Sequence, residues 1–154
     1  MMKIKELGHL AFKCRDLEES LHFYRDILGF PVKFCLYYAD IGQSNPGEEE
    51  RWIVYVQLTE RLFIELFDGR GAERLSVPSG ETFNYQHLSL IVEDIHAACE
   101  ELKAKGATID DEPSLGIDNT WQMWSHDPDG NKIEFMQYTE KSYQLVGRTD
   151  KSLD

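Results

Sequence analysis

The sequence predicts an α+β fold in which a unit of one strand, one helix and three strands is written twice. The first observation is a repeated segment, since residues 8–17 and 86–95 align without gaps. Each segment begins with His-Leu, at His9 and His87, and reaches an aspartate seven positions after the histidine, at Asp16 and Asp94. The second observation is that each segment is followed by helical and then extended patterns.

Each repeat has a predicted helix after its strand. Asp16 and Asp94 are N-cap residues in type, because an aspartate side chain can accept from the free amides of the first helical turn. Glu19 completes a capping-box pattern, while Gly29 and Gly106 supply C-terminal stops. Apolar residues then recur at helical spacing: Leu17, Leu21, Tyr24 and Leu28 in the first copy, and Ile95, Ala98, Cys99 and Leu102 in the second.

Three extended segments are predicted after each helix. They are residues 31–39, 52–58 and 62–67 in the first copy, and 107–109, 120–125 and 132–138 in the second. Asp127-Pro128-Asp129-Gly130 has the composition of a type I turn and predicts a hairpin between the last two strands. The loop 40–50 is a candidate cover over a site or a plain surface connection, and residues 69–82 are the expected linker between copies.

The length of 154 residues predicts one domain over 1–138, made of modules 5–68 and 83–138, followed by a polar tail over 139–154. A net charge of −12 argues against nucleic acid and anionic membranes as partners. Three dispersed cysteines and the lack of a long apolar run favour a cytoplasmic protein. The acidic runs 48–50 and 110–112 are interpreted as solvated carboxylates in loops.

Four polar residues recur at equivalent positions of the repeat. His9 and His87 begin the first strand of each copy, and Glu65 and Glu134 follow an isoleucine in the last strand of each copy. Glu65 lies in the run RLFIELFDG, where side chains alternate between two largely apolar faces. An ionised carboxylate there costs several kcal/mol of solvation unless it is paired or binds a metal.

Two imidazoles and two carboxylates that converge suit a divalent first-row metal ion. Any one of these residues alone is better explained as a hydrogen-bonded core residue or a charge on an edge strand. Their joint recurrence favours a metal site formed by His9, Glu65, His87 and Glu134. His22, His96 and His126 have no such counterpart and are left out of the site.

Several aromatic and sulfur-containing residues have two open interpretations. They either line a substrate pocket or belong to ordinary core and sheet packing. The residues are Tyr37, Tyr38, Trp52, Tyr55, Trp121, Met123 and Trp124.

With these motifs in order, the chain resembles the vicinal oxygen chelate superfamily, and within it glyoxalase I and its relatives. The resemblance is carried by GHLAFKCRDLEESLHFYRDILGF, IEL, HLSLIVEDI and HDPDGNKIEF, and it spans about residues 5–138. It implies two βαβββ modules that form a curved mixed sheet around a metal, commonly in a homodimer. His9, Glu65, His87 and Glu134 fall on the four ligand positions of the family.

The resemblance implies a lyase or isomerase of glyoxalase type. Glu134 would act as the base that moves a proton through a metal-bound enediolate, turning a hemithioacetal into a thioester. Nickel or zinc is the expected ion, with cobalt, manganese or iron as alternatives, and the substrate is a small molecule with adjacent oxygens. Whether one chain or two subunits supply the four ligands is left open.

The alternatives are an epimerase, a ring-cleaving dioxygenase or a drug-binding resistance protein of the same superfamily. Glu65 favours the glyoxalase branch. The ring-cleaving dioxygenases follow a three-ligand pattern that lacks a ligand at this place, and the epimerases usually have glutamine there. Two positions depart from glyoxalase I. Lys13 stands where an arginine commonly holds a glutathione carboxylate, and Gly69 stands where the family has asparagine. Lys13 is the candidate substrate-binding residue, although lysine lacks the bidentate fork of arginine.

Overall fold

The computed structural model describes residues 2–43, 50–70 and 85–147. The chain divides into two compact units, residues 1–76 and 77–154. Residues 44–49 of the predicted loop 40–50 and residues 71–82 of the predicted linker 69–82 lie outside the described part. Each unit is described by itself below.

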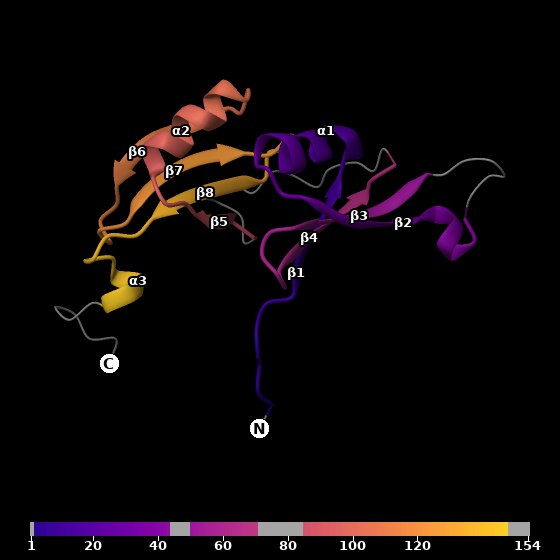
Figure 1. Ribbon diagram of the computed structural model, residues 1–154, viewed down its shortest axis with the longest axis horizontal. Helices are drawn as coiled ribbons and strands as arrows, with labels where there is room; N and C mark the ends of the chain where they lie inside the picture. Colours follow the sequence, from indigo (N-terminus) through magenta and orange to yellow (C-terminus); the bar gives the residue numbers. More distant parts are fainter. Residues whose placement is uncertain (1, 44–49, 71–84, 148–154) are drawn as a thin grey trace. The chain divides into compact units, whose positions relative to one another are not determined.

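The first unit contains a four-stranded mixed sheet (Figure 1). Its strands lie in the order β1-β4-β3-β2, with β1 parallel to β4 and the other pairs antiparallel. A 3₁₀ turn, η2 (Tyr38–Ile41), follows β2. The other elements in chain order are β1 (His9–Cys14), α1 (Leu17–Leu21), η1 (His22–Ile27), β2 (Val32–Tyr37), β3 (Arg51–Gln57) and β4 (Phe63–Asp68).

The second unit has the same topology. Its sheet order is β5-β8-β7-β6, again with one parallel pair, β5 and β8, and two antiparallel pairs. The predicted α+β fold of two βαβββ modules is therefore confirmed. The elements are β5 (His87–Ile91), α2 (Ile95–Ala104), β6 (Ile109–Leu115), β7 (Trp121–His126), β8 (Lys132–Gln137) and α3 (Tyr143–Val146).

Both predicted N-caps form. Asp16 Oδ1 accepts from the amides of Glu18 and Glu19 at 2.9 and 3.1 Å. Asp94 Oδ1 accepts from the amides at positions 96 and 97, both at 3.0 Å. These bonds satisfy two orphan amides at the start of each helix and fix where each strand turns into its helix.

The first helix widens halfway along its length. After α1 the chain continues as the π-helix η1, in which the amide of Leu28 donates to the carbonyl of Phe23 five residues earlier. The extra residue per turn rotates the later side chains away from regular helical spacing. Ile27 is consequently buried, while Leu28, expected on the buried stripe, is only half-buried. Gly29 follows with φ 79°, the left-handed stop that glycine permits.

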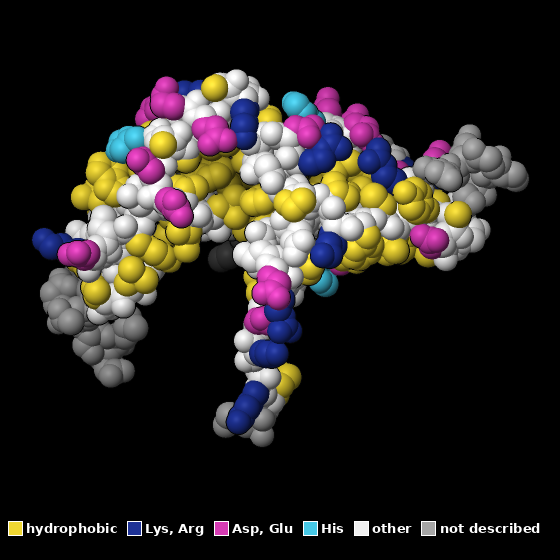
Figure 2. All heavy atoms as spheres, viewed as in Figure 1, with side chains coloured by type: hydrophobic (Ala, Val, Ile, Leu, Met, Phe, Trp, Pro, Cys, Tyr) yellow, Lys and Arg dark blue, Asp and Glu magenta, His cyan; other side chains and the backbone are white. Residues whose placement is uncertain are grey.

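The helices cover one face of each sheet and bury its aliphatic side chains. Each fully buried side chain of this size contributes roughly 1.5–3 kcal/mol of hydrophobic stabilisation. Acidic side chains lie over the outer surfaces of α1 and α2 (Figure 2). The core residues with almost no exposed surface are Leu21, Tyr24, Val54, Val56, Ile64 and Leu66 in the first unit, and Ile95, Cys99, Met123 and Ile133 in the second.

Two expectations need correction. The acidic run 110–112, interpreted as a loop, belongs to β6, which is longer than predicted and continues to Leu115. Asp110 and Glu112 are paired there with His126 and Lys103, so local charge partners outweigh the poor strand propensity of acidic residues. The segment after residue 138, expected to be a polar tail, begins with α3 and a fully buried Ser142 whose hydroxyl donates to the carbonyl of Asn119 at 3.1 Å.

No helix in the described ranges is both long enough and apolar enough to cross a bilayer.

Candidate metal centre

His9 and Glu65 meet on one face of the first sheet. β1 and β4 run parallel with His9 opposite Phe63, so His9 and Glu65 project to the same side, one pleat apart. His9 Nδ1 lies 3.6 Å from Glu65 Oε1. Glu65 is 8% exposed, whereas the His9 side chain is 54% exposed. The carboxylate is thus fixed in the sheet and the imidazole is accessible to a ligand.

Tyr55 accounts for the burial of Glu65. It lies directly across from Glu65 on β3, and its hydroxyl donates a hydrogen bond to the carboxylate. This bond, with the burial of the phenol and the negative charge beside it, raises the pKa of Tyr55 to about 12. The neutral phenol is therefore a stable donor, and it offsets part of the solvation that Glu65 loses.

The second unit repeats the pair. His87 Nε2 lies 3.3 Å from Glu134 Oε2, and the Glu134 side chain is 14% exposed. The position across from Glu134 on β7 is Trp124, whose ring meets the His87 ring edge to face at a centroid distance of 4.9 Å. The second pair is therefore bordered by an indole where the first pair has a phenol.

The register shows that the two pairs are structurally equivalent. Ala11 on β1 is the direct strand partner of Glu65, and Ser89 on β5 is the direct strand partner of Glu134. The structure therefore brings His9 to Glu65 and His87 to Glu134, as two half-sites. Among the described residues, no group of three or more histidine, cysteine or acidic side chains is placed so that it could hold a metal ion. The four-ligand set stays a prediction.

Each half-site has donors that fit a divalent ion. A neutral imidazole nitrogen and a carboxylate oxygen are ligands for zinc, nickel and their first-row neighbours. Two ligands from one unit are fewer than the three or four protein ligands usual for such ions.

Lys13 lies on the same face as the first pair. It is opposite Phe67, two residues beyond Glu65 along β4, and it is exposed. Its substrate-binding role stays a prediction.

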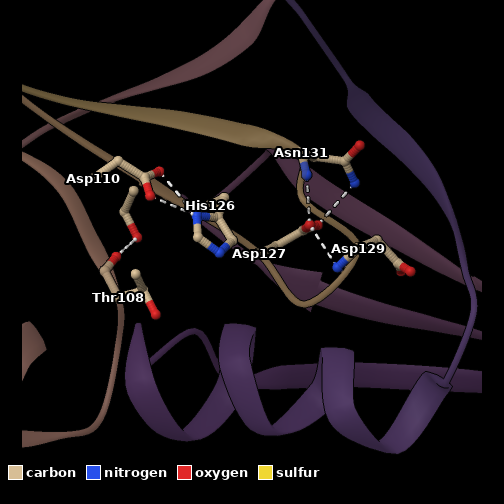
Figure 3. A network of polar contacts seen from close by, with 7 residues as sticks. Thr108, Asp110, His126, Asp127, Asp129 and Asn131 are labelled. Atoms are coloured by element: carbon tan, nitrogen blue, oxygen red, sulfur yellow. Dashed lines mark hydrogen bonds and ion pairs between the residues drawn. The ribbon is translucent and has the colours of Figure 1, made fainter. Parts of the chain in front are cut away.

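The three remaining histidines have other partners. His22 Nδ1 lies 3.0 Å from Asp26 on the same helix, and the His96 ring packs against Trp121. His126 Nδ1 lies 2.8 Å from Asp110 (Figure 3). These contacts give each histidine a local structural role.

The hairpin turn before β8 is built around a buried aspartate (Figure 3). Asp127 is 2% exposed; its Oδ1 accepts from the amides of Asp129 and Asn131, and its Oδ2 accepts from the Asn131 side chain. The amide of Gly130 donates to the carbonyl of Asp127 at 2.8 Å, as the predicted type I turn requires. This turn sets the register of β8, the strand that carries Glu134.

Four of the seven residues with two open interpretations fall into two groups. Tyr38 and Met123 are buried in the packing of their units. Tyr55 and Trp124 instead lie across from Glu65 and Glu134. Sequence reasoning left these two out of the site, because the residue that faces each glutamate depends on the register between neighbouring strands.

Comparisons with known proteins identify the family. Residues 6–135 match the model of the Glyoxalase/Bleomycin resistance protein/Dioxygenase superfamily. A probable lactoylglutathione lyase from Synechocystis sp. is 31% identical over 136 residues, covering 88% of this chain and 97% of that protein. A lactoylglutathione lyase from Neisseria meningitidis serogroup A is 29% identical, with 85% and 89% covered. A superfamily member from Sphaerobacter thermophilus superposes with a TM-score of 0.64 at 26% identity, covering 88% of this chain and 98% of that one.

Proposed function

Because this chain belongs to the Glyoxalase/Bleomycin resistance protein/Dioxygenase superfamily, we propose that it is a divalent-metal-dependent lyase or isomerase of glyoxalase I type. The observation that carries the proposal is the pair of histidine–glutamate contacts at equivalent register positions, His9 with Glu65 and His87 with Glu134. Relatives at 29–31% identity that are named lactoylglutathione lyase support the reaction class.

In this proposal the four side chains hold one divalent ion, with nickel or zinc expected. When bound, the ion supplies positive charge for the oxygens on which negative charge develops as a proton leaves the adjacent carbon. The proton itself is handled by the protein. Glu134 accepts it from one carbon and returns it to the next, the role that the family resemblance implies for the glutamate at this position. Glu65, more deeply buried and bonded to Tyr55, keeps its place as a ligand.

The substrate is proposed to be a small molecule with two adjacent oxygens, and not necessarily a glutathione adduct. Lys13 can pair with a carboxylate of such a molecule as a single point charge. An asparagine cannot stand at Gly69 without moving the backbone, because a Cβ there would lie 2.2 Å from the carbonyl oxygen of Cys14. The asparagine that the family has at this position is therefore excluded here by packing.

The proposal includes a cytoplasmic homodimer. The dimer is proposed because the resemblance to the glyoxalase family implies one. Sedimentation of the purified protein with and without metal would give the oligomeric state.

Metal analysis tests the site. Purified protein loaded with nickel or zinc and then dialysed should retain about one ion per four-ligand set, and His9→Ala should retain much less. His22→Ala is the matched control, because it removes a histidine that pairs with Asp26 outside the proposed centre. Equal metal retention in wild type and His9→Ala would refute the site.

The reaction is tested separately. Metal-loaded protein is incubated with methylglyoxal and glutathione, and thioester formation is followed by absorbance and product analysis. Glu134→Gln should lower kcat by at least 100-fold, since the base is lost while an amide oxygen stays. If the loaded wild type forms no thioester but isomerises other 2-oxoaldehyde adducts, glutathione is refuted as the thiol and the reaction class stands.

A further inference from the structure

The two half-sites differ in the residue that faces the glutamate. Across the first sheet at this level the partners are Phe34, Tyr55 and Glu65, and across the second they are Asp111, Trp124 and Glu134. A fold that repeats its ligands so closely therefore places a hydroxyl beside one carboxylate and an indole beside the other.

The Tyr55 ring has two neighbours, Phe34 on β2 and Glu65 on β4. It stacks on Phe34 with ring centroids 4.1 Å apart and an interplanar angle of 17°. It is also a direct cross-strand neighbour of Glu65, on the strand next to β4. Stacking on Phe34 and the cross-strand position restrict how the Tyr55 ring can turn, and they keep its hydroxyl on the side of the Glu65 carboxylate.

We propose that Tyr55 is the positioning residue that fixes Glu65 as a permanent metal ligand, while Trp124, in the equivalent place, leaves Glu134 without a tyrosine hydroxyl and available for proton transfer. This inference rests on the proposed function, since it assigns unequal roles to the two glutamates of that site. Residues that hydrogen-bond to ligands orient them and typically change metal affinity by about 10–100-fold when removed.

Trp124 has a different contact. Its ring meets the ring of His87, the residue paired with Glu134, edge to face. The second half-site therefore orients its imidazole by aromatic packing, whereas the first orients its carboxylate by a hydrogen bond. Glu65 and Glu134 therefore have different neighbours, although the strands that carry them occupy equivalent positions in the two units.

The first test is metal affinity. Apo protein is titrated with Co²⁺ against a competing chelator, and the visible d–d bands of the Co²⁺ protein are recorded. Tyr55→Phe should weaken Co²⁺ binding by about 10-fold or more and alter the band intensities, with an unchanged circular dichroism spectrum. Tyr143→Phe is the matched control: it removes a tyrosine hydroxyl from α3 and should change neither.

The second test exchanges the hydroxyl at the other half-site. Trp124→Tyr and Trp124→Phe differ in one hydroxyl, so Trp124→Tyr should bind Co²⁺ at least as tightly as Trp124→Phe and turn over about 10-fold more slowly, as measured by kcat.

The outcomes separate the two levels of inference. If wild type binds Co²⁺ and Tyr55→Phe binds it with equal affinity and the same spectrum, the role of Tyr55 is refuted and the metal site stands. Equal turnover of the two Trp124 variants would refute the role of Trp124. If wild type binds no metal, the proposed function itself fails.

Discussion

Glu65→Gln should change the stability of the metal-free and metal-loaded protein in opposite directions. In the metal-free protein an ionised carboxylate that is 8% exposed loses solvation worth several kcal/mol, and the amide avoids this cost. The amide oxygen still accepts from Tyr55, although exchanging a charged for a neutral acceptor loses about 1 kcal/mol. We therefore expect metal-free Glu65→Gln to be as stable as wild type or more stable, by up to about 2 kcal/mol.

The metal-loaded protein should respond in the other way. An amide oxygen is a weaker ligand than a carboxylate, and a Kd raised about 100-fold removes about 2.7 kcal/mol of metal-dependent stabilisation when the metal exceeds both Kd values. The assay is urea unfolding followed by circular dichroism, with and without saturating nickel or zinc. Glu93→Gln, at an exposed position before α2, is the matched control and should change neither curve.

Two results would refute this reasoning. If metal-free Glu65→Gln is less stable than wild type by more than about 2 kcal/mol, Glu65 is a structural anchor whose charge the fold requires. If the metal stabilises both proteins equally, Glu65 is not a ligand.

Three further predictions concern the framework of the site. Asp127→Ala should lower the free energy of unfolding by about 2–4 kcal/mol, because it leaves two turn amides without their buried acceptor. Asp127→Asn should lower it by less than half of that amount, and thermal melts followed by circular dichroism would compare the two variants. Asp94→Ala should cost about 1 kcal/mol through the lost N-cap, with Asp94→Ser close to wild type in the same assay. In the native protein a thiol reagent should modify half-buried Cys35 well before buried Cys99. Burial raises the pKa of both thiols, so their accessibility sets the order. Mass spectrometry of the labelled peptides would show the order, and equal rates would contradict it.

The helix boundaries and the turn were predictable because their causes are local. Asp16 and Asp94 cap the residues that follow them, and Asp127 with Gly130 closes a four-residue turn. The repeat itself placed His9 and Glu65 at the same steps as His87 and Glu134, and alternation along a strand gave the face.

Other features depended on partners far along the chain. β6 runs through 110–112, where Asp110 pairs with His126 and Glu112 pairs with Lys103, and neither partner is a near neighbour in sequence. The π-helix η1 shifts burial from Leu28 to Ile27, which regular periodicity cannot foresee.

The sequence by itself determined the α+β repeat and the four candidate ligands, because strand alternation, capping and turn chemistry act over a few residues. The tertiary structure decided which residue faces each glutamate, and it supplied the tyrosine that makes the burial of Glu65 possible. The physical reason is register: the alignment of β3 with β4 and of β7 with β8 is set by packing and turns along the whole strand pair, and no local pattern at positions 55 or 124 encodes it.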